Sequence, residues 1–520
     1  MQQVESTMDA DQELSRLGYR NDFKRSLSIW TILSLSVAIM AVPFGLSTTL
    51  YITLINGQGV TVIWGWVFIT LVSLCIAASM AEICAVYPVA GGPYFWSAML
   101  SPPQFAPIAA WVTGWLNLVD NWLVMVSINF SGSQIVLSAA TLFHEDYVPT
   151  AWQTVVVFWA FISFSTVINI FGTRYLNIIN TACIAWTSAS IVIFMAVLLA
   201  TCGKMRSGAF VFANYDTSAS GWPTGWSFFI GLLQGAYVML GYGLISALCE
   251  EARNHAKEVP RAIVTSVLVA GVLGAAFLIP VMFTLPEIEV LLAVASGQPI
   301  GLLFKLVTGS SAGAMGLLIL IIGIFCFSSI GSATVASRFT YAFSRDGAVP
   351  GHKIWSRVNQ RLGVPVQATL LGAAVSFCMG PIYFGSSAAF NSFTGTATIC
   401  LSTSYGVPIF ISLLRRRRDV ENSLYSLKPV GTIINAISVT WVIFSTALFC
   451  LPVALPATAS TMNYASVVFT GFGIISIIWY IVYGRKHFSG PMAAVDKSIE
   501  GQIVEVMERE VPAHAKKHEA

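Results

Sequence analysis

The chain has 520 residues, of which 56% are hydrophobic and only 10% are charged. A soluble globular domain carries about 25% charged residues, so this composition excludes a water-soluble protein. The net charge of +3 at pH 7 is too small to indicate a nucleic-acid partner. Nine scattered cysteines without a CxxC pair predict neither a disulfide framework nor a metal site, and we expect no cofactor.

Apolar runs bounded by proline, glycine and charged residues predict twelve membrane-spanning helices, because each crossing needs about 20 mainly apolar residues. We therefore expect an all-α integral membrane protein. The predicted spans cover residues 27–55, 59–86, 106–143, 152–173, 175–202, 224–249, 260–285, 312–343, 365–384, 388–414, 430–452 and 463–484.

The basic residues orient these spans, because loops that stay in the cytoplasm are enriched in lysine and arginine. With the N-terminus in the cytoplasm, all of the 27 basic residues except Lys204, Arg206 and Lys305 face the cytoplasm. The run Arg415–Arg418 is then the basic flank of a span rather than a nucleic-acid patch. We expect cytoplasmic tails at 1–26 and 485–520, in the plasma membrane or, alternatively, in a vacuolar or other internal membrane.

The first span contains a predicted break in mid-membrane. Pro43 removes a backbone donor there, and Gly45 relaxes the conformation. The predicted break comprises Ala41, Val42, Pro43, Phe44 and Gly45. An ordinary proline kink is the alternative.

The sixth span contains a second predicted break, at Gly241, Tyr242 and Gly243. Each break lies about halfway along the first helix of one of two halves of similar length. Unpaired backbone groups at membrane depth are tolerated only where they line a cavity, and paired broken helices are typical of transporter binding sites. The pair therefore predicts a solute-binding site, unless the glycines only allow close helix packing.

The third span carries Asp120, the one acidic residue well inside a predicted span. At 100° per residue it shares a polar stripe with Thr113, Asn117, Ser127, Ser131, Gln134 and Ser138. An ionisable group at this depth indicates a substrate, ion or proton pathway. The alternative is a structural carboxyl group that is protonated or hydrogen-bonded to Asn117 or Asn121.

Two further groups of residues are candidates. Ser328, Ser329 and Ser332 lie near mid-membrane in the eighth span, where small hydroxyl residues either coordinate a cation or let helices approach, and packing is the preferred interpretation. Four charged residues lie near cytoplasmic helix ends, where salt bridges at a gate or snorkelling would satisfy them. These are Glu82, Glu250, Glu251 and Arg338.

Three motifs resemble the amino acid/polyamine/organocation permeases, and most closely their fungal amino acid/choline/GABA branch. The resemblance covers roughly residues 15 to 490. The motifs are Ala81-Glu82 through Gly91-Gly92-Pro93-Tyr94-Phe95-Trp96, Glu250-Glu251-Ala252-Arg253-Asn254 with Val259-Pro260-Arg261-Ala262-Ile263, and Ser337-Arg338 through Arg345-Asp346-Gly347.

The resemblance implies a five-plus-five inverted repeat, 27–202 and 224–414, with discontinuous first and sixth helices and two additional helices at 430–484. It also implies alternating access around a site between the first, third, sixth and eighth helices. Both breaks are more apolar than is usual in the family. We therefore hypothesise a cation held by Asp120 and by aromatic faces, with Leu244 beside it. The aromatic candidates are Phe44, Tyr237, Tyr242 and Trp122.

We predict a gradient-driven permease of an amino acid, GABA, choline, polyamine or related basic solute, with the lipid bilayer as its surroundings and no obligate protein partner. The alternatives are an exporter of a cationic secondary metabolite and a nutrient receptor that does not transport. An enzyme is not expected, because an activated nucleophile needs a nearby base and the spans contain no histidine.

Overall fold

The computed structural model describes residues 28–491, except 145, 253–254, 295–297, 386, 422, 459–461 and 489. The predicted tail 1–26 and most of the tail 485–520 lie outside these residues, as do Arg253 and Asn254 of the second motif. Within the described residues the chain is helical, without a named strand, and twelve helices are long and apolar enough to cross a membrane. The prediction of a twelve-span all-α protein is confirmed.

The first five spans closely follow the predicted runs. They are α2 (Ile29–Met40) with α3 (Val42–Thr48), α5 (Gln58–Val86), α7 (Ala106–Thr141), α8 (Ala151–Phe171), and η1 (Thr173–Tyr175) with α9 (Leu176–Thr201). Short helices lie between or after them: α4 (Leu50–Ile55), α6 (Pro93–Leu100) and α10 (Gly208–Ala213). The first span ends at Thr48 rather than at residue 55, because the helix is interrupted at Thr49 before α4.

The sixth span is composite and the next four are single or nearly continuous helices. They are α11 (Thr224–Gly231), α12 (Leu233–Met239), η2 (Leu240–Tyr242) and η3 (Leu244–Glu251), then α13 (His255–Phe283), α16 (Ser311–Arg345), α18 (Val366–Met379) with α19 (Ile382–Gly385), and α20 (Ser387–Leu414). The seventh span begins at Ala256 rather than at residue 260, because Pro260 lies inside α13.

Two more spans complete the bundle. They are α21 (Val430–Leu448), and α22 (Ala465–Trp479) with η4 (Tyr480–Gly484) and α23 (Arg485–His487). Connections in the second half contain α14 (Ile288–Leu292), α15 (Ile300–Thr308) and α17 (His352–Trp355).

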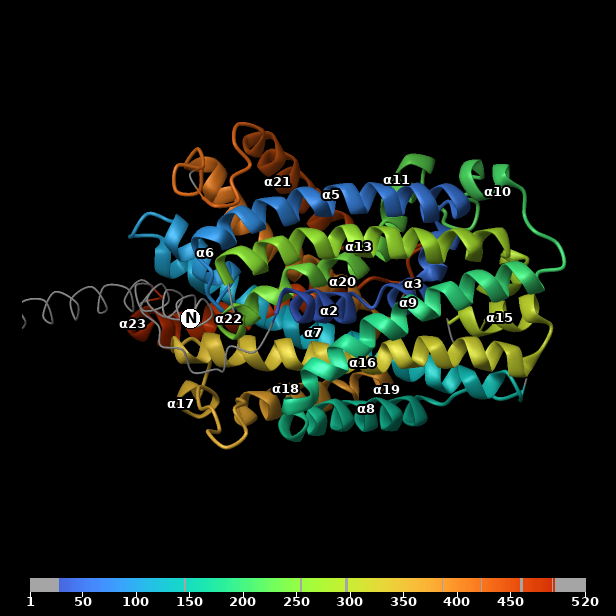
Figure 1. The fold of residues 1–520 in the computed structure, drawn as a ribbon, viewed down its shortest axis with the longest axis horizontal. Coiled ribbons are helices and arrows are strands. Elements are labelled where there is room, and N and C mark those ends of the chain that lie inside the picture. The colour runs from blue at the N-terminus through green and yellow to red at the C-terminus, as the bar shows by residue number, and fades with distance from the viewer. Residues whose placement is uncertain are drawn as a thin grey trace, which may run out of the picture.

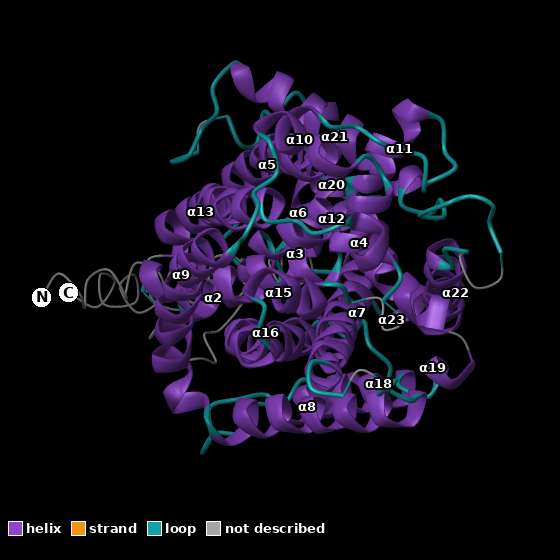
Figure 2. Ribbon diagram, turned by 90° about the vertical axis from the view of Figure 1, so that its right-hand side faces the viewer, coloured by secondary structure: helices purple, strands orange, loops and turns teal. Residues whose placement is uncertain are grey.

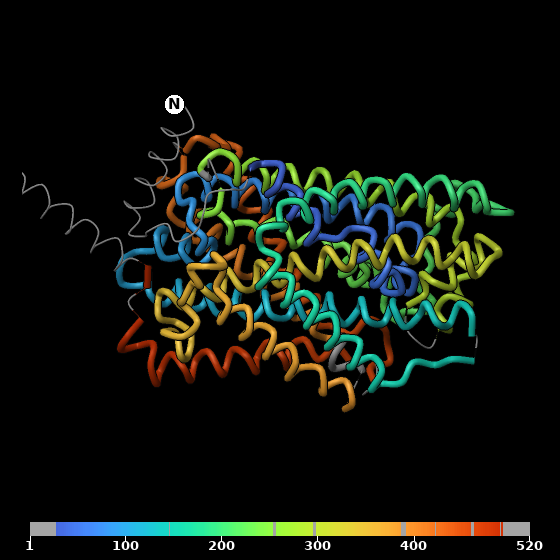
Figure 3. Tube along the Cα trace, turned by 60° about the horizontal axis from the view of Figure 1, so that its bottom comes forward, coloured from blue at the N-terminus to red at the C-terminus, as the bar shows by residue number. Residues whose placement is uncertain are grey.

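The helices run along the long axis of the molecule and define two ends (Figure 1). We call the end with α6, α17 and α23 the α6 end, and the end with α10 and α15 the α10 end. The described chain enters α2 from the α6 end and leaves α22 there, as an even number of spans requires (Figure 3).

Four spans form the centre of the bundle, seen end-on in Figure 2. The spans differ in how many residues of their most apolar stretch are buried inside the protein. The buried share of that stretch is 83% in the first and sixth spans, 72% in the third and 67% in the tenth, but 11% in the twelfth. This difference follows from the sequence. The central spans carry polar side chains that find partners inside the protein, whereas the twelfth exposes isoleucines such as Ile474 and Ile477.

Candidate functional site

The first span is broken at Ala41. The α2 helix ends at Met40 and α3 begins at Val42, while Ala41 has left-handed backbone angles of φ 43° and ψ 48°. The break follows from Pro43, which has no N–H group and whose ring would clash with the carbonyl of Ile39 in a continuous helix. That carbonyl instead accepts a hydrogen bond from Ser328 of α16, at 3.4 Å. The predicted break in the first span is confirmed.

The sixth span changes its winding rather than opening. The α12 helix ends at Met239, and two 3₁₀ segments continue the span to Glu251 with right-handed angles at Leu240 and Gly243. A 3₁₀ turn keeps its backbone hydrogen bonds, which an apolar setting demands. The expected break at Gly241–Gly243 is therefore a change of helix type that begins at Leu240.

Close contacts explain both glycines at this transition. A β-carbon on Gly241 would lie 2.9 Å from Cγ of Met40, and one on Gly243 would lie 2.3 Å from Cζ of Tyr405. Tyr405 of α20 also donates a hydrogen bond to the carbonyl of Leu240 at 3.1 Å. The glycines thus bring the first and tenth spans against the point where the sixth span changes its winding.

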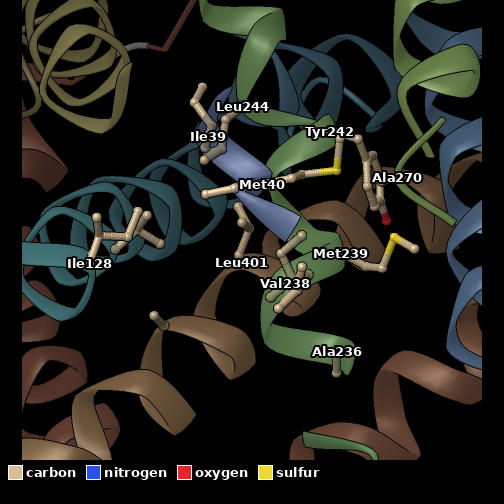
Figure 4. Packing of buried hydrophobic residues seen from close by; sticks show 14 of the residues in the cluster. Ile39, Met40, Ile128, Ala236, Val238, Met239, Tyr242, Leu244, Ala270 and Leu401 are labelled. Atoms are coloured by element: carbon tan, nitrogen blue, oxygen red, sulfur yellow. The ribbon is translucent and has the colours of Figure 1, made fainter. Parts of the chain in front are cut away.

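A small cavity lies beside the two irregular points, with a volume of about 30 Å³. A cavity needs about 10–15 Å³ of such volume to hold one water molecule, so this one is too small for an amine solute. Figure 4 shows the packing next to it, where Ile39, Met40, Val238, Leu244 and Leu401 gather around the junction of α2 and α3. Side chains must therefore separate before a solute can enter.

The cavity is mostly apolar and collects part of the predicted site. The predicted residues that line it are Ala41, Phe44, Gly45, Tyr237, Gly241, Leu244 and Ser328. Those that do not are Val42, Pro43, Asp120, Tyr242, Gly243, Ser329 and Ser332. The tenth span adds Ala397, Thr398 and Leu401, which sequence reasoning missed. A run of small and hydroxyl residues inside that apolar span was the available signal.

Asp120 lies one helical turn from the cavity, because Val124 of the same helix lines it. Its side chain is fully buried, and within the described residues neither carboxyl oxygen has a hydrogen-bond partner. The expected alternative of a bond to Asn117 or Asn121 is therefore not formed in this structure, and Nδ2 of Asn121 donates instead to Oδ1 of Asn117 at 2.7 Å. Asp120 is thus an acidic group without a structural partner.

Tyrosines lie between Asp120 and the irregular part of the sixth span. Tyr237 lines the cavity and its hydroxyl is hydrogen-bonded to Ser127 at 2.8 Å. Tyr237 and Tyr405 are close enough to Asp120 to interact with it electrostatically, as is Cys400. Tyr242 instead packs on Tyr405, with ring centroids 5.7 Å apart.

The predicted polar stripe on α7 is turned into the protein. Thr113, Asn117, Ser127 and Ser138 are buried, and Ser131 and Gln134 are partly buried. Thr113 donates to Ser97 at 3.0 Å, and Gln134 accepts from Gln298 at 3.0 Å. Thr113, Ser127 and Gln134 therefore bond to other segments, whereas Asn117 and Ser138 bond within α7.

The serines of α16 have separate neighbours. Ser328 faces the first-span break, as described above, whereas Ser329 donates to Asn129 of α7 at 2.6 Å. Ser332 donates to the carbonyl of Ser329, one turn earlier, at 3.1 Å. Of the three hydroxyl groups, only that of Ser328 lies at the cavity, and no cluster of metal ligands occurs among the described residues.

Ion pairs close the α6 end, and they connect the three sequence motifs. Arg338 and Arg345 of α16 contact Glu251 and Glu250 of η3, at 2.9 and 3.0 Å. Tyr94 of α6 donates to Asp346 at 2.7 Å. The motifs, which are far apart in the sequence, therefore form one closure between the sixth span, the eighth span and α6.

A third pair, which is buried on both sides, joins Glu82 to Arg417. The Arg417 Nη2 atom lies 2.5 Å from Oε1 of Glu82, which also accepts a hydrogen bond from the Leu427 backbone at 2.8 Å. Arg417 is only 4% exposed. Sequence reasoning missed its role, because an arginine within the run 415–418 is indistinguishable from a basic flank.

Comparison with known proteins gives one consistent result. A model described as "Amino acid permease" matches residues 27–473. The amino-acid permease BAT1 of Arabidopsis thaliana is 32% identical over 94% of this chain and 97% of its own length. The polyamine transporter TPO5 of Saccharomyces cerevisiae is 31% identical over 94% and 80%, and a choline transporter of the same yeast is 29% identical over 89% and 82%.

Proposed function

The chain belongs to the amino acid permease family, and we propose that it moves a small solute with a positively charged nitrogen by alternating access around the central cavity. Like these relatives, the protein is a multi-pass membrane permease of nitrogenous solutes, and it is not an enzyme. The proposal adds the charge of the solute, the position of its site and the mechanism.

One observation carries the proposal: the carboxyl group of Asp120, which is buried and has no hydrogen-bond partner among the described residues, lies one turn from a small apolar cavity. Amino acids, polyamines and choline all contain a cationic nitrogen, and relatives named for these three substrates resemble the chain. An opposite charge is the direct way to bind such a nitrogen at low dielectric. The faces of Phe44 and Tyr237 line the same cavity and add cation–π attraction.

Alternating access would use the two irregular spans. The first and sixth spans depart from regular α-helix beside the cavity, at Ala41 and Leu240. We propose that residues 27–202 and 224–414 are inverted repeats that move around this site. A proton or solute gradient is the proposed energy source. Both termini are assigned to the cytoplasm, in the plasma membrane or an internal membrane, without an obligate partner.

The test is solute counterflow in vesicles that contain the purified protein, with labelled choline, putrescine, GABA, arginine and alanine as probes. Wild-type protein should exchange at least one of these amines. Ala397→Leu, which fills the cavity wall, should raise the half-saturating concentration at least about tenfold. Ala436→Leu on the exposed face of α21 is the matched control and should behave as wild type.

Four outcomes would overturn parts of the proposal. Absence of exchange for all probes would remove the permease function, and binding without exchange would favour a receptor. Unchanged affinity in Ala397→Leu would place the solute elsewhere. Exchange only of larger aromatic amines in a wider panel would favour an exporter of cationic secondary metabolites.

A further inference from the structure

The surroundings of Asp120 do not neutralise a negative charge. The ionisable side chains of the elements around it are those of Tyr237 on α12, Tyr242 on η2, Cys400 and Tyr405 on α20, Tyr94 on α6, Cys75, Glu82 and Cys84 on α5, Lys305 on α15, Cys378 on α18, and Cys326, Tyr341, Arg338 and Arg345 on α16. Glu82 is paired with Arg417, and Lys305 donates to the carbonyl of Leu142. Arg338 and Arg345 contact Glu251 and Glu250 instead, and α3 and α8 contain no ionisable residue. The groups that interact with Asp120 are neutral when protonated, as tyrosine and cysteine are at pH 7.

A carboxylate in this position is therefore unstable unless something positive binds it. Burying a lone charge away from water is strongly unfavourable, and a buried acid takes up a proton instead. The closed conformation thus has two stable forms, one with a proton on the Asp120 carboxyl and one with a cationic nitrogen beside its carboxylate.

We propose that Asp120 exchanges one proton for one solute cation, so that the protein is an electroneutral proton/amine antiporter. This inference rests on the proposed function and specifies its coupling. When the site opens, the carboxylic acid releases its proton to water, and the carboxylate binds the solute ammonium group. On the other side the solute leaves, and the carboxylate takes a proton from water before the site closes again.

The sixth span links this exchange to conformation. Tyr237 connects the cavity to Ser127 of α7, and Tyr405 connects α20 to the carbonyl of Leu240. Both tyrosines lie near Asp120, so movement of the sixth span changes the access of water to the carboxyl group. Closure around an ionised, unoccupied Asp120 is the unfavourable step that prevents leak.

The experiment uses vesicles loaded with a pH-sensitive dye, with the membrane potential clamped at zero by potassium and valinomycin. Uptake of a monovalent amine identified by counterflow should release about one proton from the lumen per solute, and changing the clamped potential should not change the rate. Asp120→Asn should reduce proton-coupled accumulation at least about 20-fold, while Asp120→Glu should retain it. Asp216→Asn, on the exposed loop before α11, is the matched control.

A measurement without transport keeps the proposal testable if a variant is inactive. The melting temperature of the purified wild type should fall as pH rises, because the closed state must hold the proton, and the amine should restore it at high pH. The melting temperature of Asp120→Asn should show neither effect. An Asp120→Asn protein with the pH dependence of the wild type would overturn the proposal.

The failures are distinguishable. If wild-type protein exchanges no amine at all, the proposed function fails. If it exchanges amines but moves no protons, moves net charge, or remains proton-coupled without Asp120, the permease assignment stands and the antiport proposal is wrong.

Discussion

The two ends of the bundle are closed by different chemistry. At the α6 end two partly buried ion pairs connect the sixth span to the eighth, and one fully buried pair connects the second span to the segment after the tenth. Towards the α10 end the first and sixth spans meet through neutral hydrogen bonds. Gln234 accepts from Thr53 at 2.7 Å and donates to the carbonyl of Leu46 at 2.8 Å.

This difference indicates which end of the bundle opens first. A neutral hydrogen bond contributes about 0.5–1.5 kcal/mol net, whereas a hydrogen bond to a charged group contributes about 1.5–3 kcal/mol. The α10 end therefore separates with the smaller loss, and we expect solute to reach the cavity from there first. Variants at the two ends should differ in size of effect and in which side opens.

The largest effect is expected at the Glu82–Arg417 pair. Arg417→Met should lower the free energy of unfolding by about 3–5 kcal/mol, because Glu82 is then buried without a cation. Chemical denaturation in detergent measures the change. Arg418→Met, an exposed neighbour, is the control, and adding Glu82→Gln should recover most of the loss. Equal effects at 417 and 418 would contradict the prediction.

An intermediate effect is expected at Glu251, whose side chain is 15% exposed and can reach water. Arg338→Met should open the α6 end and raise the rate of maleimide labelling at Cys249, which is fully buried, by about tenfold. The measurement uses a variant with Cys249 as its only cysteine. Arg357→Met, on the exposed loop after α17, should leave the rate unchanged.

The smallest effects are expected towards the α10 end. Gln234→Leu should cost about 1–3 kcal/mol because it removes two hydrogen bonds, and Thr53→Val about half as much. Both losses should be independent of salt, since no ion pair is broken. Denaturation at two salt concentrations measures them, and a larger loss in Thr53→Val than in Gln234→Leu would show that this end is closed in another way.

The fold could be predicted well from the sequence because a membrane helix is determined by the residues within it. A span satisfies its own backbone, so its length and apolarity identify it without knowledge of its neighbours. The same argument predicted the break at Ala41, since Pro43 acts on its own helix. The glycines at 241 and 243 permit several geometries, so their sequence did not distinguish an opened turn from the 3₁₀ winding that the structure has.

The missing parts of the site depend on distant contacts. Arg417 pairs with Glu82, which lies 335 positions away in the chain. Tyr405 donates a hydrogen bond to the carbonyl of Leu240, which lies 165 positions away. A single sequence carries no signal for such pairs. The pairing of Glu250 and Glu251 with Arg345 and Arg338 was equally invisible, although three of these four residues stood out as charges at helix ends.

The left-handed backbone of Ala41 also affects the lifetime of the conformation seen in this structure. An L-residue with a β-carbon in this region costs about 1–2 kcal/mol, and glycine avoids most of that penalty. Any conformation in which residue 41 returns to right-handed angles regains this energy. The methyl group of Ala41 therefore destabilises the present conformation relative to such a conformation. Natural variation at this position would change the lifetime of the present conformation and, because Ala41 lines the cavity, the cavity wall as well.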